Sequence, residues 1–285
     1  MRRSGARSAD GDAAGGRGDS AGGRDAGARE PLLLIHGLGA SAGVWDPVLP
    51  LLEGEREVVA LDLPGFGGAP SLPAEVEPTA AALAGALRTR LAARGIERPH
   101  VAGNSLGAWV GLELGRMGAA RSVTCLSPAG LWRAPIGRAD SRTRAWARRL
   151  RPLVPLALRI GPLRRRALAT FAAHPGDIPA AAGRELVLGW IDADGYEGTD
   201  KAMREHIFEP AGYPAEVPVT IAWAELDRLV GPPRPECQPA GARFLVLRGV
   251  GHTPMWDDPE LIAATILAGS RVGSEEPVTR EGGAA

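Results

Sequence analysis

Short apolar runs alternate with longer segments of helical periodicity along most of the chain, a pattern typical of a parallel sheet covered by helices. Six runs predict strands, at residues 32–35, 58–61, 100–102, 123–126, 217–223 and 244–247. Four segments predict helices, at residues 45–52, 79–94, 106–117 and 259–269. The pattern therefore predicts an α/β fold with a mostly parallel central sheet flanked by helices.

This alternation is interrupted once. Residues 131–210 hold no convincing strand and are helix-like with several prolines, so we expect a helical cap inserted into the fold. The core then comprises residues 31–130 and 211–271. Residues 1–30 are a Gly, Ala, Arg and Asp mixture without the apolar stretch of a signal peptide, and they predict a disordered tail. Residues 272–285 predict a flexible C-terminal tail.

Composition fits one medium-sized enzyme domain. Of the 285 residues 45% are hydrophobic, and 33 Lys and Arg balance 33 Asp and Glu, so no global charge argues for a nucleic-acid partner. Cys125 and Cys237 form neither a disulfide framework nor a metal-binding spacing, which favours a reducing, cytoplasmic location. We expect no metal.

Charge within the predicted cap is uneven. Residues 131–170 hold eleven arginines against the single acid Asp140, whereas the second half of the cap is acidic. The favoured interpretation is that the two halves form complementary, solvated helix faces. The less favoured alternatives are that arginines such as Arg148 and Arg149 bind an anionic substrate, or that the basic face touches a membrane surface.

The strongest chemical signal is Gly103-Asn104-Ser105-Leu106-Gly107, a G-x-S-x-G motif between a predicted strand and a predicted helix. A serine at such a sharp turn takes a strained backbone, and glycines two residues to either side let the flanking segments pack closely. Upstream, the turn His36-Gly37-Leu38-Gly39 follows the first strand and leaves backbone NH groups free to face a ligand.

Two further residues follow predicted strands in the same way. Asp227 comes after residues 217–223, and His252 comes after residues 244–247. Since parallel strands place their chemistry at their carboxyl ends, we expect Ser105, Asp227 and His252 to lie together.

Other carboxylates have structural explanations. Asp62 lies in a Pro-Gly turn, where an aspartate usually bonds local backbone NH groups. Asp257 and Asp258 precede Pro259 and are expected to cap the last helix.

With these motifs the chain resembles the α/β-hydrolase superfamily, from about residue 31 to residue 269. The resemblance also uses Asp62-Leu-Pro-Gly65-Phe-Gly67 and Trp223-Ala-Glu-Leu-Asp227. It implies Ser105 as the nucleophile at the elbow, His252 as the base and Asp227 as the orienting acid. It also implies that the NH groups of Leu38 and Leu106 form the oxyanion hole, and that no cofactor is required. Serine in place of aspartate at position 105 sets the chain apart from the epoxide hydrolase and dehalogenase branches.

The expected substrate is a small, apolar acyl compound, cleaved through an acyl-enzyme as in carboxylesterases. Pocket candidates lie near the catalytic loops in sequence: Gly37, Trp109, Leu131, Trp132, Met255 and Trp256. One alternative is a carbon–carbon bond hydrolase of the meta-cleavage product type. Gly103-Asn104-Ser105 resembles the elbow of those enzymes, although Ala108 and Thr253 depart from their pattern. The other alternative is a non-catalytic ligand-binding module on the same fold.

Overall fold

The computed structural model describes residues 29–137 and 142–271, so the predicted tails lie outside the described residues except for Arg29 and Glu30. Its sheet has six parallel strands in the order β2-β1-β3-β4-β5-β6. The strands are β1 (Pro31–Ile35), β2 (Glu57–Leu61), β3 (His100–Asn104), β4 (Ser122–Leu126), β5 (Val219–Ala224) and β6 (Arg243–Leu247). The predicted α/β class with a parallel sheet is confirmed.

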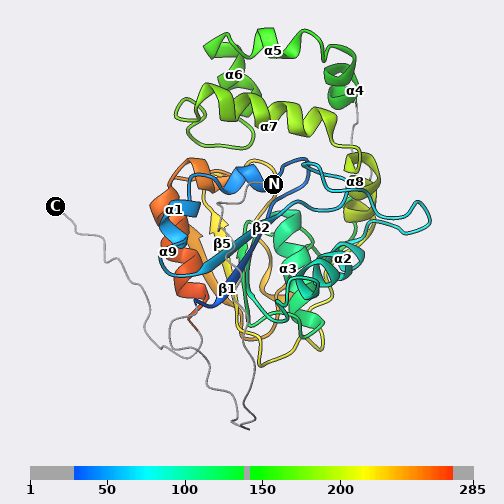
Figure 1. Cartoon of the computed structure of the whole chain (residues 1–285), viewed down its shortest axis with the longest axis vertical. Coiled ribbons are helices and arrows are strands. Elements are labelled where there is room, and N and C mark those ends of the chain that lie inside the picture. Colours follow the sequence, from blue (N-terminus) through cyan, green and yellow to red (C-terminus); the bar gives the residue numbers. More distant parts are fainter. Residues whose placement is uncertain (1–28, 138–141, 272–285) are drawn as a thin grey trace, which may run out of the picture.

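Helices cover both faces of the sheet (Figure 1). The helices α2 (Ala80–Ala92) and α3 (Leu106–Arg116) pack on one face, and α1 (Leu49–Leu52) and α9 (Pro259–Gly269) pack on the other. The alternation of β1 explains why both faces are apolar: Leu33 and Ile35 join the core under α2 and α3, whereas Leu32 and Leu34 join the core under α1 and α9.

The predicted helix at residues 45–52 is wrong in extent. The segment forms a 3₁₀ turn, η1 (Ala42–Trp45), and the single helical turn α1. Pro47 has no NH to donate, so the backbone hydrogen-bond ladder is interrupted between the two turns although Asp46 before it keeps a helical backbone. The last helix was predicted with its observed limits, and Asp258 caps it by accepting a hydrogen bond of 2.8 Å from the NH of Leu261.

The inserted segment between β4 and β5 contributes helices, and no strand, to the described residues. These are α4 (Arg142–Arg149), α5 (Val154–Ala157), α6 (Gly161–Leu168), α7 (Ala180–Asp192) and α8 (Tyr196–Glu205). In Figure 1, α4 to α7 form a separate layer above the sheet and its flanking helices. None of the helices in the described ranges is both long and apolar enough to span a bilayer.

One buried arginine holds α4 to the rest of this layer. Arg144 is 4% exposed, and its guanidinium donates hydrogen bonds to the carbonyl groups of Trp190, Ile191 and Ala193 at the end of α7. It also pairs with Glu197. A guanidinium satisfies these terminal carbonyls, and its positive charge is stabilised by the negative end of the helix dipole.

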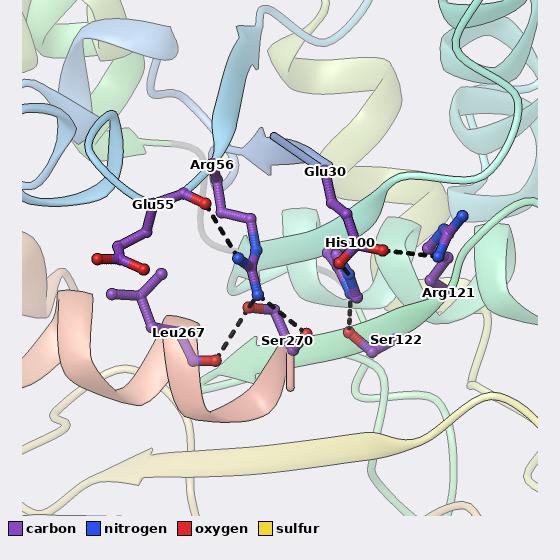
Figure 2. A network of polar contacts seen from close by, with 8 residues as sticks. All are labelled: Glu30, Glu55, Arg56, His100, Arg121, Ser122, Leu267 and Ser270. Carbon is purple, nitrogen blue, oxygen red and sulfur yellow. Dashed lines mark hydrogen bonds and ion pairs between the residues drawn. The ribbon is translucent and has the colours of Figure 1, made fainter. Parts of the chain in front are cut away.

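A polar network joins the amino ends of the strands (Figure 2). His100 at the start of β3 bonds Ser122 at the start of β4 and Glu30, which also pairs with Arg121 at 2.8 Å. Nearby, Arg56 donates hydrogen bonds to Ser270. Glu30 was predicted to be part of the N-terminal tail, but it is held by these contacts.

Candidate active site

Ser105 occupies the sharp turn between β3 and α3. Its backbone has φ 54° and ψ −118°, a strained conformation for a residue other than glycine. A hydrogen bond of 2.9 Å from its NH to the carbonyl of Leu126 holds the turn against β4. The two glycines are required by close packing: a Cβ on Gly103 would lie 2.3 Å from the carbonyl oxygen of Gly107, and a Cβ on Gly107 would lie 2.3 Å from that of Ile35.

His252 and Asp227 form a direct pair at the carboxyl ends of the neighbouring strands. The His252 Nδ1 lies 2.7 Å from Asp227 Oδ2, and the two side chains are 6% and 1% exposed. Because a carboxylate only accepts hydrogen bonds, Nδ1 carries the proton and Nε2 is left as a base.

The environment of Asp227 favours its ionised form. Burial alone would raise the pKa of this carboxyl group, but the hydrogen bond and charge of His252 and the NH groups of Val230 and Leu229 outweigh burial and hold the pKa below its usual value. Both NH groups donate to Asp227 Oδ1, at 3.0 and 2.8 Å. The other oxygen is thereby left for the imidazole.

Ser105 and His252 line the same cavity, but their side chains share no hydrogen bond in the described part of the chain. Such contacts are often long in unliganded enzymes and tighten with substrate.

Two backbone NH groups next to Ser105 have no acceptor among the described residues. They belong to Leu38, which lines the cavity, and to Leu106, the first residue of α3. The first NH groups of a helix lack intrahelical partners, and they carry the positive end of its dipole. The two NH groups are therefore available to an anionic oxygen.

His36 fixes the turn that carries Leu38. It is fully buried, its Nδ1 donates to the carbonyl of Gly37 at 2.8 Å, and its Nε2 accepts from the NH of Leu63 at 3.0 Å. Burial lowers the pKa of His36, so the ring is neutral and serves as a structural bridge. Asp62 lies beside His36 and also has a structural role. The predicted hydrogen bond to a local backbone NH is wrong, because Asp62 Oδ1 accepts a hydrogen bond of 2.7 Å from the NH of Ala42, which is 20 residues earlier in the chain.

The candidate residues open onto a cavity of about 1140 Å³ with largely apolar walls. Four of the six predicted pocket residues line it, namely Gly37, Leu131, Trp132 and Trp256. The predictions for Trp109 and Met255 are wrong. Trp109 is turned away and donates to Glu113 at 3.0 Å, and Met255 is buried in the core under α9.

Residues of α7 and α8 also line this cavity, although they are not among the predicted pocket residues. Trp190 and Tyr196 pack edge to face, with ring centroids 6.2 Å apart, against the turn that contains Gly39. Leu186 and Trp190, four residues apart on α7, both face the cavity. That helical spacing indicates an apolar face on α7, but not which surface the face covers.

The arginines of the inserted segment divide into separate groups. Arg133, Arg166 and Arg204 line the cavity, whereas Arg148 and Arg149 do not. The ion pairs Arg144–Glu197, Arg148–Glu197 and Arg151–Asp192 join the basic and acidic halves of the inserted segment, as the favoured interpretation of the charge pattern predicted.

The loop that carries His252 is anchored on both sides. Asn104, next to Ser105, donates from Nδ2 to the carbonyl of His252 at 2.8 Å and to that of Leu126 at 3.1 Å. On the other side, the NH of Thr253 donates to the carbonyl of Phe171 in the inserted segment at 2.8 Å.

Asp257 completes this second anchor and does not cap α9 as predicted. Its carboxylate accepts three hydrogen bonds, from the NH groups of Gly251 at 2.8 Å, Ala173 at 3.0 Å and His174 at 2.8 Å. The carboxylate thus joins the histidine loop to the segment after α6. Sequence spacing gave no signal for this contact, because Ala173 and Gly251 are distant along the chain.

Among the described residues, no three His, Cys, Asp or Glu side chains are clustered so that they could hold a metal ion. Cys125 and Cys237 are both buried and free.

Comparison with known proteins gives consistent matches. A family model described as "Alpha/beta hydrolase family" matches residues 32–265. "Epoxide hydrolase EphH" of Mycobacterium tuberculosis is 34% identical over 208 residues, which cover 67% of this chain and 94% of that protein. The crystal structure of a membrane phospholipase A, described as a bacterial virulence factor, is 26% identical with a TM-score of 0.65, covering 84% of this chain and 78% of the other. The enol-lactonase from Burkholderia xenovorans LB400 is similar in fold, with 18% identity, a TM-score of 0.66 and coverage of 86% and 93%.

Proposed function

The chain belongs to the α/β-hydrolase family, and from this premise we propose that it is a serine hydrolase that cleaves carboxylic esters of apolar acids through an acyl-enzyme. The observation that carries the proposal is the paired His252 and Asp227 on the wall of the cavity that also contains the strained Ser105. A buried base with a fixed tautomer on the same cavity wall as a serine hydroxyl is the arrangement that serine nucleophiles need.

In the first half of the reaction, Ser105 Oγ attacks the ester carbonyl and His252 Nε2 takes the hydroxyl proton. Asp227 holds the imidazole and stabilises the imidazolium that forms. As the tetrahedral intermediate collapses, the bond to the alcohol breaks and the alcohol leaves with the proton from His252. Ser105 remains esterified by the acyl group.

In the second half, His252 removes a proton from water while the water oxygen attacks the acyl carbonyl, and Ser105 regains its proton as the acid leaves. The NH groups of Leu38 and Leu106 stabilise the negative oxygen in both halves. Each such donor is worth about 3 kcal/mol of transition-state stabilisation.

Epoxide hydrolysis, which the name of one relative suggests, fits this nucleophile poorly. A serine oxygen that opens an epoxide forms an ether, which water does not cleave at neutral pH. A carboxylate that opens an epoxide forms an ester, which water hydrolyses to release the product. Position 105 is serine, so the proposed chemistry is acyl transfer.

The walls of the cavity support an apolar substrate. Leu131, Trp132, Trp190 and Trp256 line it, and its volume of about 1140 Å³ slightly exceeds the usual range of about 300–1,000 Å³ for small-molecule sites. Since α5, α6 and α7 supply part of the wall, we propose that residues 131–210 act as a cap over the substrate. The proposed enzyme works in a reducing compartment, the cytoplasm, which the two free cysteines support.

The test is labelling of purified protein with a fluorophosphonate, followed by turnover of short- and long-chain esters, an epoxide and a vinylogous 1,5-diketone. We expect wild-type protein and the control Ser71→Ala, which alters an exposed serine, to be labelled and to hydrolyse esters. Ser105→Ala should remain folded, lose labelling and lose ester turnover by about 10⁴-fold or more. Faster cleavage of the diketone than of every ester would instead indicate the carbon–carbon hydrolase. Folded wild-type protein that is not labelled would refute the proposal and favour a binding module.

A further inference from the structure

The outer surface of the inserted segment is unusually apolar. Among the described residues, fourteen large apolar side chains are exposed, and six of them lie within α4 to α6 and the turns that join these helices. They are Trp146, Leu150, Leu153, Leu156, Ile160 and Leu163, with exposed fractions between 48% and 62%. We call this set the cap patch.

The cap patch runs along the whole of this segment. Its members follow one another at intervals of three or four residues from α4 to α6, so each of the three helices and each joining turn contributes at least one exposed apolar side chain. The residues between them face the other way: Ala147, Val154, Ala157 and Leu158 line the cavity. The segment is therefore apolar on both sides, and only the inner side is covered by the protein.

Cations accompany the cap patch without acids. Residues 142–176 contain nine arginines and no Asp or Glu. Three of these arginines pair with acids of α7 and α8, as described above, but Arg149, Arg159 and Arg165 are exposed and form no ion pair with described residues. A face that combines large apolar side chains with unneutralised cations is complementary to the surface of an anionic lipid bilayer.

The cap patch also reaches the mouth of the cavity. Leu163 is 49% exposed and at the same time lines the cavity, and Ile136 and Leu229 have the same double position. An apolar molecule leaving a bilayer at this face would thus meet apolar side chains from the outer surface to the cavity wall.

From these observations we propose that the outer face of α4 to α6 docks on anionic membrane surfaces, with the cap patch inserted among the lipids and Arg149, Arg159 and Arg165 against their phosphates. Docking needs no helix to span the bilayer, since an interfacial segment lies in the plane of the headgroups.

The experiment is co-sedimentation with vesicles of phosphatidylcholine alone, and of equal parts phosphatidylcholine and phosphatidylglycerol. All proteins carry Ser105→Ala, so that lipid cleavage does not contribute and the result is independent of the proposed activity. The apolar variant is Trp146→Ser with Leu153→Ser and Leu156→Ser. Its matched control, the core control, replaces three exposed apolar residues that lie outside the inserted segment, Leu51→Ser with Val76→Ser and Met117→Ser.

We expect binding to the anionic vesicles, weak binding to phosphatidylcholine alone, and affinity that falls as salt is raised. Neutralising Arg149, Arg159 and Arg165 to glutamine should weaken binding about fivefold for each charge, or about a hundredfold together. The apolar variant should lose more than about tenfold, whereas the core control should bind as the parent does.

Three results would overturn the proposal. The first is no sedimentation of the Ser105→Ala parent with anionic vesicles, a result that does not depend on the folding of any surface variant. The second is equal binding by the apolar variant and its control. The third is dimerisation of the parent without lipid, measured by sedimentation velocity and abolished in the apolar variant, because the cap patch would then be a surface for a second copy of the chain.

Discussion

Asp257 offers the sharpest test of whether the inserted segment affects the proposed active site. Its carboxylate is half-buried and binds three NH groups, one from Gly251 in the histidine loop and two from residues 173 and 174 after α6. Replacement by alanine removes both acceptor oxygens and with them all three hydrogen bonds. The histidine loop and the segment after α6 then lose the carboxylate that joins them. Because His252 directly follows Gly251, we expect its position to shift.

The magnitude follows from these contacts. A hydrogen bond to a charged acceptor contributes about 1.5–3 kcal/mol, but the three bonds share one half-buried group and are not additive. We therefore expect Asp257→Ala to lower the free energy of unfolding by about 2–4 kcal/mol. A shift of His252 by about 1 Å would lower kcat on an ester by up to about 100-fold.

Asp257→Asn gives a graded intermediate. An amide oxygen at the position of Oδ2 keeps the bonds from Gly251 and Ala173, whereas the amide nitrogen faces the NH of His174. Two of the three bonds remain, so we expect both stability and kcat to lie between those of the parent and of the alanine variant.

The neighbouring residue is the matched control. Asp258 caps α9 with one hydrogen bond, so Asp258→Ala should cost about 1 kcal/mol of stability and leave kcat unchanged. The assays are urea unfolding and steady-state ester hydrolysis, with kcat and KM measured separately. The reasoning is refuted if Asp257→Ala unfolds no more easily than Asp258→Ala and retains the parent kcat.

Three further predictions concern single residues. Asp227→Asn should keep the fold by circular dichroism but lower kcat about 10⁴-fold, because the amide favours the wrong tautomer of His252; a loss below tenfold contradicts the proposed role. Arg144→Ala should expose the end of α7 and increase proteolytic cleavage within residues 142–205, whereas alanine at an exposed arginine of α4 should not; equal cleavage rates would exclude its anchoring role. Burial lowers the pKa of His100 below 6.5, although the hydrogen bond and charge of Glu30 act in the opposite direction. The pKa of Glu30 is lowered below 4.5, mainly by its hydrogen bond to His100. The unfolded chain therefore binds more protons at this histidine, and the free energy of unfolding should fall as pH drops from 6.5 to 4.5 and fall less steeply in His100→Asn; identical slopes in urea unfolding would contradict this linkage.

Sequence patterns predicted those parts of the fold that depend on neighbours along the chain. The helix at 259–269 was placed correctly because Asp258, Pro259 and a terminal glycine mark its ends. The elbow was identifiable because close packing forces glycine at positions 103 and 107. The parallel topology supplied the rest, since strand ends collect at one edge and bring the loops of Asp227 and His252 together.

Contacts made by the inserted segment were not predictable in this way. Trp190 reaches the cavity wall because α7 folds back over the turn after β1, where Gly39 has a φ of 76° and a Cβ would lie 2.7 Å from the indole. A Cβ on Gly251 would lie 2.7 Å from the NH of Ala173, so this glycine too is needed for the approach of the inserted segment. Each glycine looks in the sequence like part of an ordinary loop. Only the packing of a distant segment against each glycine shows that the two loops next to Ser105 are shaped to receive the inserted segment. The position of that segment is thereby coupled to the geometry of the proposed catalytic residues.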